Sequence, residues 1–267
     1  MLPVRDGGRH GLVAAADTPG PEESHEMSRV GIVGGLGPES TIDYYRRILE
    51  AWEREDPSTA PAVVIDSLDV KLALRLVETD RAALVEYLLA SLRRLAGAGA
   101  DFAAMTANTP HLVFDELAAL SPVPLVSIVE ACADEARRRG LRRLALLGTR
   151  FTMEGPFYPA VFERRGISVA PPGDGDRAWI HARYVGELLR GDFRDETRER
   201  LTSLVGRLRD EEGIDGVILG GTELPLLLRA EVVAGLPALD TTALHVAAIV
   251  GRLRGGGPPA GADVHAA

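Results

Sequence analysis

From residue 28 onward, short apolar runs alternate with longer amphipathic stretches. The runs 29–35 (RVGIVGG) and 61–68 (PAVVIDSL) predict buried strands, the first of them leading into a Gly-rich turn. The stretches 38–55 and 80–99 carry apolar residues at helical spacing. This repeated order of strand and helix predicts an α/β fold with mainly parallel sheets that helices cover on both faces.

The alternation continues along the rest of the chain. Further strands are expected at 100–107, 124–128, 141–149 and 215–221. Further helices are expected from 109 and at 129–140 and 155–166. Residues 1–27 are rich in Gly, Pro and charge and lack the apolar core of a signal peptide. We therefore expect a disordered tail there and a loose Gly/Pro tail at 254–267.

Two segments of the chain are alike. Gly99–Pro110 aligns without a gap over Gly213–Leu224, so that Ala107 falls on Gly221. Each segment has a Gly, an apolar strand, a small residue and then polar residues, and ligands bind at the carboxyl ends of strands in open α/β sheets. The repeat predicts two pseudo-symmetric lobes with a site between them, although strands of α/β proteins also resemble one another by chance.

The composition favours small-molecule partners. The net charge of −9 and the scattered arginines give no basic surface for nucleic acid, and no apolar run approaches the ~20 residues that span a membrane. The one cysteine, Cys132, excludes an intrachain disulfide and any multi-cysteine metal site, and its helical context predicts a buried structural thiol. The histidines have no metal-site spacing. We expect a cytoplasmic protein without a metal or a cofactor.

Four blocks then carry a resemblance. They are GIVGGLGPESTIDYYRRI (31–48), TANTPHLVFDEL (106–117), LLGTRFTMEGPFY (146–158) and LGGTELPLLL (219–228). In this order they resemble the aspartate/glutamate racemase family of cofactor-independent amino acid racemases. The resemblance runs from Arg29 to about Leu253. It implies an isomerase, usually a homodimer, with two Rossmann-like lobes formed by 28–128 plus 235–253 and by 129–234.

The sequence departs from the family at its two proton-transfer positions. The resemblance places a residue, usually cysteine, before the Asn-Thr of one block and another before the Thr-Glu of the last. This chain has Ala107 and Gly221 there. Two-base racemisation needs a group that removes the α-proton from one face and a group that donates a proton to the other. Ordinary racemisation is therefore expected to be lost.

The residues that hold a substrate carboxylate in the family are present. Hydroxyl and amide donors follow strand ends in both lobes, at Asn108, Thr109, Thr149, Thr152 and Thr222, although each threonine could equally be a helix N-cap. The resemblance adds Arg46 as a further carboxylate ligand, with a solvated helix arginine as the alternative.

The resemblance also bears on the substrate's side chain. Trp179 stands where relatives specific for acidic amino acids commonly carry a lysine. This exchange removes a cation and supplies a flat apolar face, which favours a bulkier and less acidic substrate.

Several residues remain as candidates for acid–base chemistry. Glu223, beside Gly221, is the first choice because a carboxyl in a closed cleft can have its pKa raised, although it could merely cap a helix. Asp66, with Ser67, follows a strand end, and His111 lies three residues beyond Asn108 and could equally be a structural hydrogen-bonding group.

Three functions are compatible with this pattern. The first is an isomerase of the family that uses one base or a bound water in place of the two cysteines. The second is a lyase, decarboxylase, dehydratase or cyclase on a bulkier carboxylic acid, which needs at most one proton transfer and electrostatic stabilisation. The third is a binding protein without catalytic activity. In each case the expected partner is a small amino or carboxylic acid.

Overall fold

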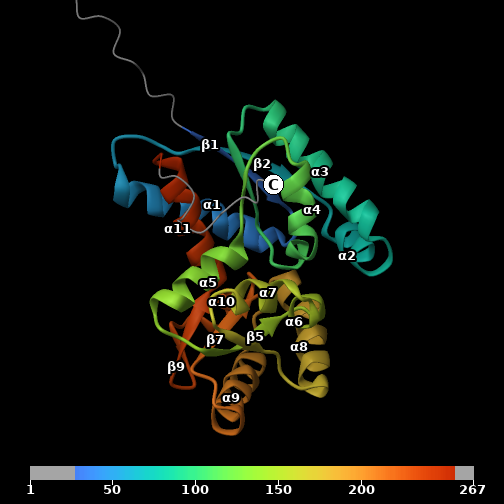
Figure 1. The fold of residues 1–267 in the computed structure, drawn as a ribbon, viewed down its shortest axis with the longest axis vertical. Coiled ribbons are helices and arrows are strands. Elements are labelled where there is room, and N and C mark those ends of the chain that lie inside the picture. The colour runs from blue at the N-terminus through green and yellow to red at the C-terminus, as the bar shows by residue number, and fades with distance from the viewer. Residues whose placement is uncertain (1–27, 256–267) are drawn as a thin grey trace, which may run out of the picture.

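Two separate sheets form the framework of the protein (Figure 1). The computed structural model describes residues 28–255, so the tail expected at 1–27 and most of that expected at 254–267 lie outside the described residues. The first sheet has the strand order β2-β1-β3-β4 and the second β6-β5-β7-β9-β8. All neighbours pair in parallel except β8 and β9. The expected α/β fold with mainly parallel sheets is confirmed.

The strands of the first sheet are short, and the two central ones, β1 and β3, are buried. They are β1 (Arg29–Gly34), β2 (Ala62–Ser67), β3 (Phe102–Met105) and β4 (Leu125–Val126). The helical segments that follow them are α1 (Pro38–Glu55), α2 (Val70–Thr79), α3 (Arg81–Gly97), η1 (Thr109–Val113), α4 (Phe114–Leu120) and α5 (Ile128–Arg138). Asp69, Asp80 and Ser127 cap α2, α3 and α5, each accepting hydrogen bonds from backbone N–H groups of the first turn.

The second sheet is built in the same way. Its strands are β5 (Arg143–Gly148), β6 (Ser168–Ala170), β7 (Gly216–Gly220), β8 (Val232–Val233) and β9 (Leu236–Asp240). Its helical segments are α6 (Arg150–Glu154), α7 (Phe157–Glu163), α8 (Asp174–Gly186), η2 (Leu188–Arg190), α9 (Asp195–Glu212), α10 (Leu224–Leu228) and α11 (Thr241–Leu253).

The two sheets share one topology. The order β2-β1-β3-β4 matches β6-β5-β7-β9, which places β3 and β7 at equivalent positions. These are the strands that precede Ala107 and Gly221. The two pseudo-symmetric lobes predicted from the internal repeat are therefore present.

The lobes exchange one helix each. Helix α5 follows β4 of the first sheet, but its Cys132 packs in the apolar cluster of Leu144, Leu146 and Ile218 in the second lobe. Helix α11 follows β9 of the second sheet and packs against β1, β3 and α1. The buried cysteine is the structural thiol expected from its sequence context.

One boundary expected from the sequence is wrong. Residues 235–253 were expected in lobe one, but β9 within this range pairs with β7 of the second sheet, with Leu239 opposite Ile218. Only α11 lies against the first sheet. The strand is short and apolar, so its sequence does not distinguish which sheet it joins. We therefore propose that lobe two includes β9.

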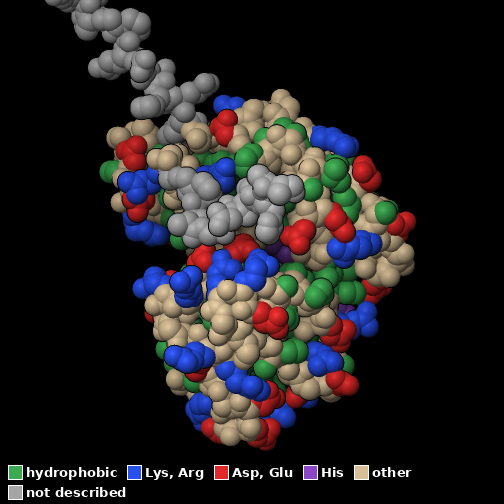
Figure 2. Space-filling model, viewed as in Figure 1, with side chains coloured by type: hydrophobic (Ala, Val, Ile, Leu, Met, Phe, Trp, Pro, Cys, Tyr) green, Lys and Arg blue, Asp and Glu red, His purple; other side chains and the backbone are tan. Residues whose placement is uncertain are grey.

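The surface carries mixed charge. Figure 2 shows basic and acidic side chains interspersed over the visible face, with no extended area of one sign. Within residues 28–255, no helix has the length and hydropathy needed to cross a membrane.

Candidate functional site

A pocket lies between the lobes at the carboxyl ends of the central strands. Ala107 after β3 and Gly221 after β7 both line it, together with Gly220. The two positions aligned by the internal repeat thus face the same space. That space is narrow, with a cavity volume of about 40 Å³.

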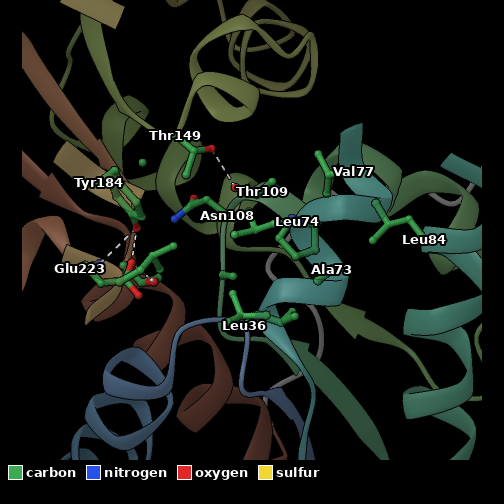
Figure 3. A pocket seen from close by; sticks show the side chains of 17 residues that line it. Leu36, Ala73, Leu74, Val77, Leu84, Asn108, Thr109, Thr149, Tyr184 and Glu223 are labelled. Carbon is green, nitrogen blue, oxygen red and sulfur yellow. Dashed lines mark hydrogen bonds between the residues drawn. The ribbon is translucent and has the colours of Figure 1, made fainter. Parts of the chain in front are cut away.

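The pocket has one apolar and one polar wall (Figure 3). The apolar wall comes mostly from α2 and its neighbours and consists of Leu36, Val70, Ala73, Leu74, Val77 and Leu84. The polar side chains are Asn108, Thr109, Thr149, Tyr184, Thr222 and Glu223. A ligand here meets hydrogen-bonding groups on one side and aliphatic groups on the other.

Glu223 is the buried carboxyl group of the polar wall. Its side chain is 2% exposed, and all of its side-chain partners are hydroxyl groups. Ser40 of α1 donates to Oε1 at 2.8 Å, Thr222 donates to Oε2 at 3.2 Å, and Tyr184 of α8 also donates to Oε2. Burial raises the pKa of Glu223 above its usual value near 4.5, and no cation within residues 28–255 forms an ion pair with it.

The Gly-rich turn after β1 makes room for this carboxyl group. A Cβ at Gly37 would collide with Oε1 of Glu223, so any larger residue at this position would displace the carboxyl group. The turn leads into α1, which begins at Pro38 and presents Ser40 in its first turn. The turn thus allows the two lobes to meet at Glu223.

Three threonines link the lobes beside the pocket. Thr109 of η1 lies 2.9 Å from the Thr149 hydroxyl and 3.4 Å from the Thr152 hydroxyl. Thr149 also caps α6 by accepting from the Thr152 backbone N–H at 3.3 Å. Thr109 and Thr149 line the pocket, whereas Thr152 is fully buried behind them and positions their hydroxyls.

Asn108 is held by buried partners. Its Oδ1 accepts from the Tyr158 hydroxyl at 2.6 Å, and its Nδ2 donates to Thr241 Oγ1 at 3.2 Å. This leaves one N–H of the amide for a ligand. The structure therefore brings five expected site residues to one pocket: Asn108, Thr109, Thr149, Thr222 and Glu223.

Asp66 and Ser67 do not belong to this pocket. Asp66 accepts hydrogen bonds from Ser91 at 2.5 Å and from Arg94 at 2.7 Å, both on α3. These partners hold its pKa below the usual value although partial burial opposes them. Neither Asp66 nor Ser67 lines the pocket, because β2 is the edge strand of its sheet. The catalytic interpretation of Asp66 and the binding interpretation of Ser67 are not supported.

His111 is a structural residue. It is 2% exposed, its Nδ1 lies 3.1 Å from the Ala107 carbonyl oxygen, and its Nε2 accepts from the Ile128 N–H. Burial lowers its pKa to about 3. Both ring nitrogens are occupied and the ring is outside the pocket, so the structure does not support His111 as the acid–base group.

Arg46 and Trp179 lie elsewhere. Arg46 is exposed on α1 and lines a separate polar groove with Arg47 and Asp240. Trp179 packs under the Arg200 guanidinium, 4.1 Å from the ring centre, on the side of α8 that faces α9. The residue that α8 directs into the pocket is Tyr184, five positions later. Five residues rotate a helix by about 140°, which places these two side chains on different faces.

Three contributors to the site were not predicted from the sequence. Helix α2 was not recognised, although Asp69 as a cap and apolar residues at 70, 73, 74 and 77 are its signal. Tyr184 and Ser40 carry no local signal, because each becomes relevant only through its contact with Glu223 from a distant element. Residues 28–255 contain no group of His, Cys, Asp and Glu able to hold a metal ion.

Comparisons with known proteins agree with this architecture. The sequence profile described as Asp/Glu/hydantoin racemase matches residues 33–249. The chain is 23% identical over 221 residues to the broad specificity amino-acid racemase RacX of Bacillus subtilis (strain 168), covering 80% of this chain and 93% of that protein.

Solved structures have the same fold. An aspartate racemase homologue from Pyrococcus horikoshii OT3 is 34% identical with a TM-score of 0.73, covering 85% of this chain and all (100%) of that one. The Picrophilus torridus aspartate racemase is 21% identical with a TM-score of 0.71, covering 85% of this chain and 94% of that one. The matched profile covers most of the sequence, and the chain belongs to the Asp/Glu/hydantoin racemase family.

Proposed function

We propose that this protein is an enzyme that binds the carboxylate of a small amino or carboxylic acid between its lobes and moves one proton at the adjacent carbon. The Glu223 carboxyl supplies and accepts this proton. Ordinary two-base racemisation is lost, because the methyl of Ala107 and the hydrogen of Gly221 cannot exchange a proton.

One observation carries the proposal. Glu223 is a buried carboxyl group that lines the pocket beside Gly221 and is neutralised by no cation within the described residues. A carboxyl with a raised pKa is suited to acid–base work near neutral pH. No equivalent group lies beside Ala107, where the nearest titratable residue in sequence, His111, has both ring nitrogens engaged.

The polar wall supports carboxylate binding. The free N–H of Asn108 and the hydroxyls of Thr109 and Thr149, which share one hydrogen bond, face the pocket from both lobes, whereas the Thr222 hydroxyl donates to Glu223. Uncharged donors of this kind suit a carboxylate. The family relation points the same way, because RacX is named as an amino-acid racemase.

The apolar wall favours a second candidate reaction. Leu74 and Val77 present aliphatic groups where an acidic side chain would need a cation. A substrate with an alkyl or aryl group fits this wall. With one acid–base group available, a lyase or decarboxylase reaction that ends in protonation of one face is compatible with the same site.

Proton exchange in deuterated water tests the proposal. The wild-type protein is incubated with 2-phenylpropionate and with L-amino acids that have acidic, alkyl or aromatic side chains, and the α-proton signal is followed by NMR. We expect enzyme-dependent deuterium uptake at the α-carbon with retained configuration, and about a 10²-fold or greater loss in Glu223→Gln. Equal rates in Glu223→Gln and wild type, or no reaction with any compound, would contradict the proposal.

A further inference from the structure

Position 221 has no side chain, but the space beside it is filled. A Cβ built on Gly221 would lie 2.6 Å from the Tyr184 hydroxyl oxygen and 2.8 Å from its Cζ, both too close for a real contact. The Tyr184 ring therefore occupies the volume that a side chain at 221 would need. Glycine at 221 and tyrosine at 184 fit together as a pair.

Tyr184 brings a hydroxyl group to this volume from another element. The side chain extends from α8 to the end of β7, lines the pocket and is 3% exposed. Its hydroxyl donates to Oε2 of Glu223 and lies 3.5 Å from the Glu223 backbone nitrogen. Figure 3 shows the Tyr184 and Glu223 side chains directed toward each other at the polar wall.

We propose that the Tyr184 hydroxyl is the catalytic group on the Gly221 side of the pocket, relaying a proton between the substrate's α-carbon and the Glu223 carboxylate. This inference rests on the proposed function. In this proposal Tyr184 of α8 has the acid–base role that a side chain at position 221 would otherwise have.

The relay conserves atoms and charge. When a proton leaves the α-carbon, the Tyr184 oxygen accepts it while the phenolic proton passes to Oε2 of Glu223. The substrate gains the negative charge that the Glu223 carboxylate loses. In the reverse direction the protonated Glu223 returns its proton to Tyr184 as the phenolic proton passes to the carbanion. No oxidant, metal or further reactant is required.

The surroundings suit the two groups to these roles. Burial and the nearby Glu223 charge raise the pKa of Tyr184 well above its usual value, so the phenol keeps its proton and acts as a relay. Ser40 and Thr222 satisfy the carboxyl oxygens from other directions and fix the group toward Tyr184. A tyrosine that only filled space at position 184 would not need a hydrogen bond to the Glu223 carboxyl group.

Exchange measurements on three variants separate this inference from the proposed function. With any compound of the panel that the wild type exchanges, Tyr184→Phe is expected to lose about 10²-fold or more, as does Glu223→Gln. Tyr44→Phe is the control, because Tyr44 is also a buried tyrosine, bonded to His245 outside the pocket. Loss in Glu223→Gln with full activity in Tyr184→Phe would overturn the relay and leave the proposed function standing.

A second experiment tests the pairing without any substrate. Gly221→Ala is expected to lower the melting temperature by about 2–10 °C, because its methyl collides with the Tyr184 ring. In a Tyr184→Ala background the same substitution should cost less than about 2 °C. Equal losses in both backgrounds would show that Tyr184 does not fill the position and would overturn the inference.

The same pair allows a gain-of-function test. Gly221→Cys with Tyr184→Ala places a thiol in the volume that the phenol vacates. Exchange of the α-proton is expected to recover at least tenfold over Tyr184→Ala alone, whereas Gly221→Cys with Tyr184 retained is expected to be poorly folded. Absence of recovery in a double variant that melts as Tyr184→Ala does would count against the relay position.

Discussion

Two buried glutamates show how single residues acquire different roles. Glu187 is 4% exposed and is held by Thr197 and by ion pairs with Arg183 and Arg194, which lower its pKa despite burial. Glu223 is 2% exposed and has hydroxyl partners only, so burial raises its pKa. The first is a structural ion-pair residue. Glu223 is costly to ionise in the folded protein, as expected of a carboxyl group that serves in catalysis.

This difference in pKa predicts that replacing Glu223 or Glu187 with glutamine has opposite effects on the free energy of unfolding. The folded-state pKa of Glu223 lies above its unfolded value, so the folded state loses stability as pH rises from about 4.5 through the raised value. Glu223→Gln should remove this loss and increase the free energy of unfolding at pH 8 relative to wild type, with a smaller effect at pH 4. Urea unfolding at the two pH values measures it.

Glu187→Gln is the matched control for that experiment. Its lowered pKa contributes stability above about pH 4.5 that is lost at lower pH. The variant is therefore expected to be destabilised at pH 8 more than at pH 4. If Glu223→Gln were also destabilised more at pH 8 than at pH 4, the conclusion that the pKa of Glu223 is raised would be wrong.

At the scale of elements, α2 forms the apolar wall. The helix presents Val70, Ala73, Leu74 and Val77 to the pocket, whereas Arg75 is exposed on the opposite side. Its fixed contacts are mainly with α3. The pocket is narrow, so we expect its walls to separate when a bulky substrate binds and α2 to be the wall that moves.

We therefore predict that α2 determines the substrate side chain. Leu74→Ala removes aliphatic surface from the wall and should weaken binding of alkyl or aryl carboxylates by roughly 10-fold or more. Arg75→Ala, on the same helix but outside the pocket, should bind them as wild type does. Thermal shift titration with phenylacetate and with succinate measures both variants. Stronger stabilisation by succinate in the wild-type protein would contradict the apolar role of the wall.

The elements also show what the sequence could predict. Helix α1 was expected at 38–55 and occupies Pro38–Glu55, because its apolar spacing is regular and Pro38 marks its start. Trp179 was expected in the site from the family resemblance, but Tyr184 of the same helix, α8, lies there. The apolar spacing of a helical sequence predicts which residues are buried. Because α8 buries two faces, one against α9 and one at the pocket, the spacing does not show which of these residues face the pocket.

The site residues that directly follow strands could be predicted from the sequence. Asn108, Thr109, Thr149, Thr222 and Glu223 follow strands β3, β5 and β7, and parallel strands bring their carboxyl ends together. The contacts that α1 and α8 make with the end of β7 could not be predicted, because they depend on how distant elements pack against this strand. The same limit explains why strand β9 was assigned to the wrong sheet.

At the scale of the molecule, the exchanged helices join the lobes through buried histidines. His245 of α11 bonds the Tyr44 hydroxyl of α1 at 2.9 Å and the Val126 carbonyl of β4 at 3.0 Å. His111 bonds the Ala107 carbonyl and the Ile128 N–H at the start of α5. Both rings are neutral in the fold and satisfied by these partners.

The histidines predict an acid limit to stability. Burial lowers the pKa of His245 to about 4 and that of His111 to about 3, below the usual 6.5. Each contributes stability above pH 6.5 that is lost as pH falls, at about 1.4 kcal/mol per pH unit. Urea unfolding from pH 7 to pH 5 in the Glu223→Gln background measures the slope. A flat profile would contradict two buried neutral histidines, and His245→Gln should halve the slope.

Because neither Ala107 nor Gly221 carries an acid–base side chain, we expect this protein not to racemise acidic amino acids. Chiral chromatography of L-glutamate and L-aspartate after prolonged incubation with the wild-type protein measures any racemisation. No D-enantiomer should form above the level of the protein-free sample. Formation of D-glutamate or D-aspartate at a rate proportional to protein concentration would contradict it.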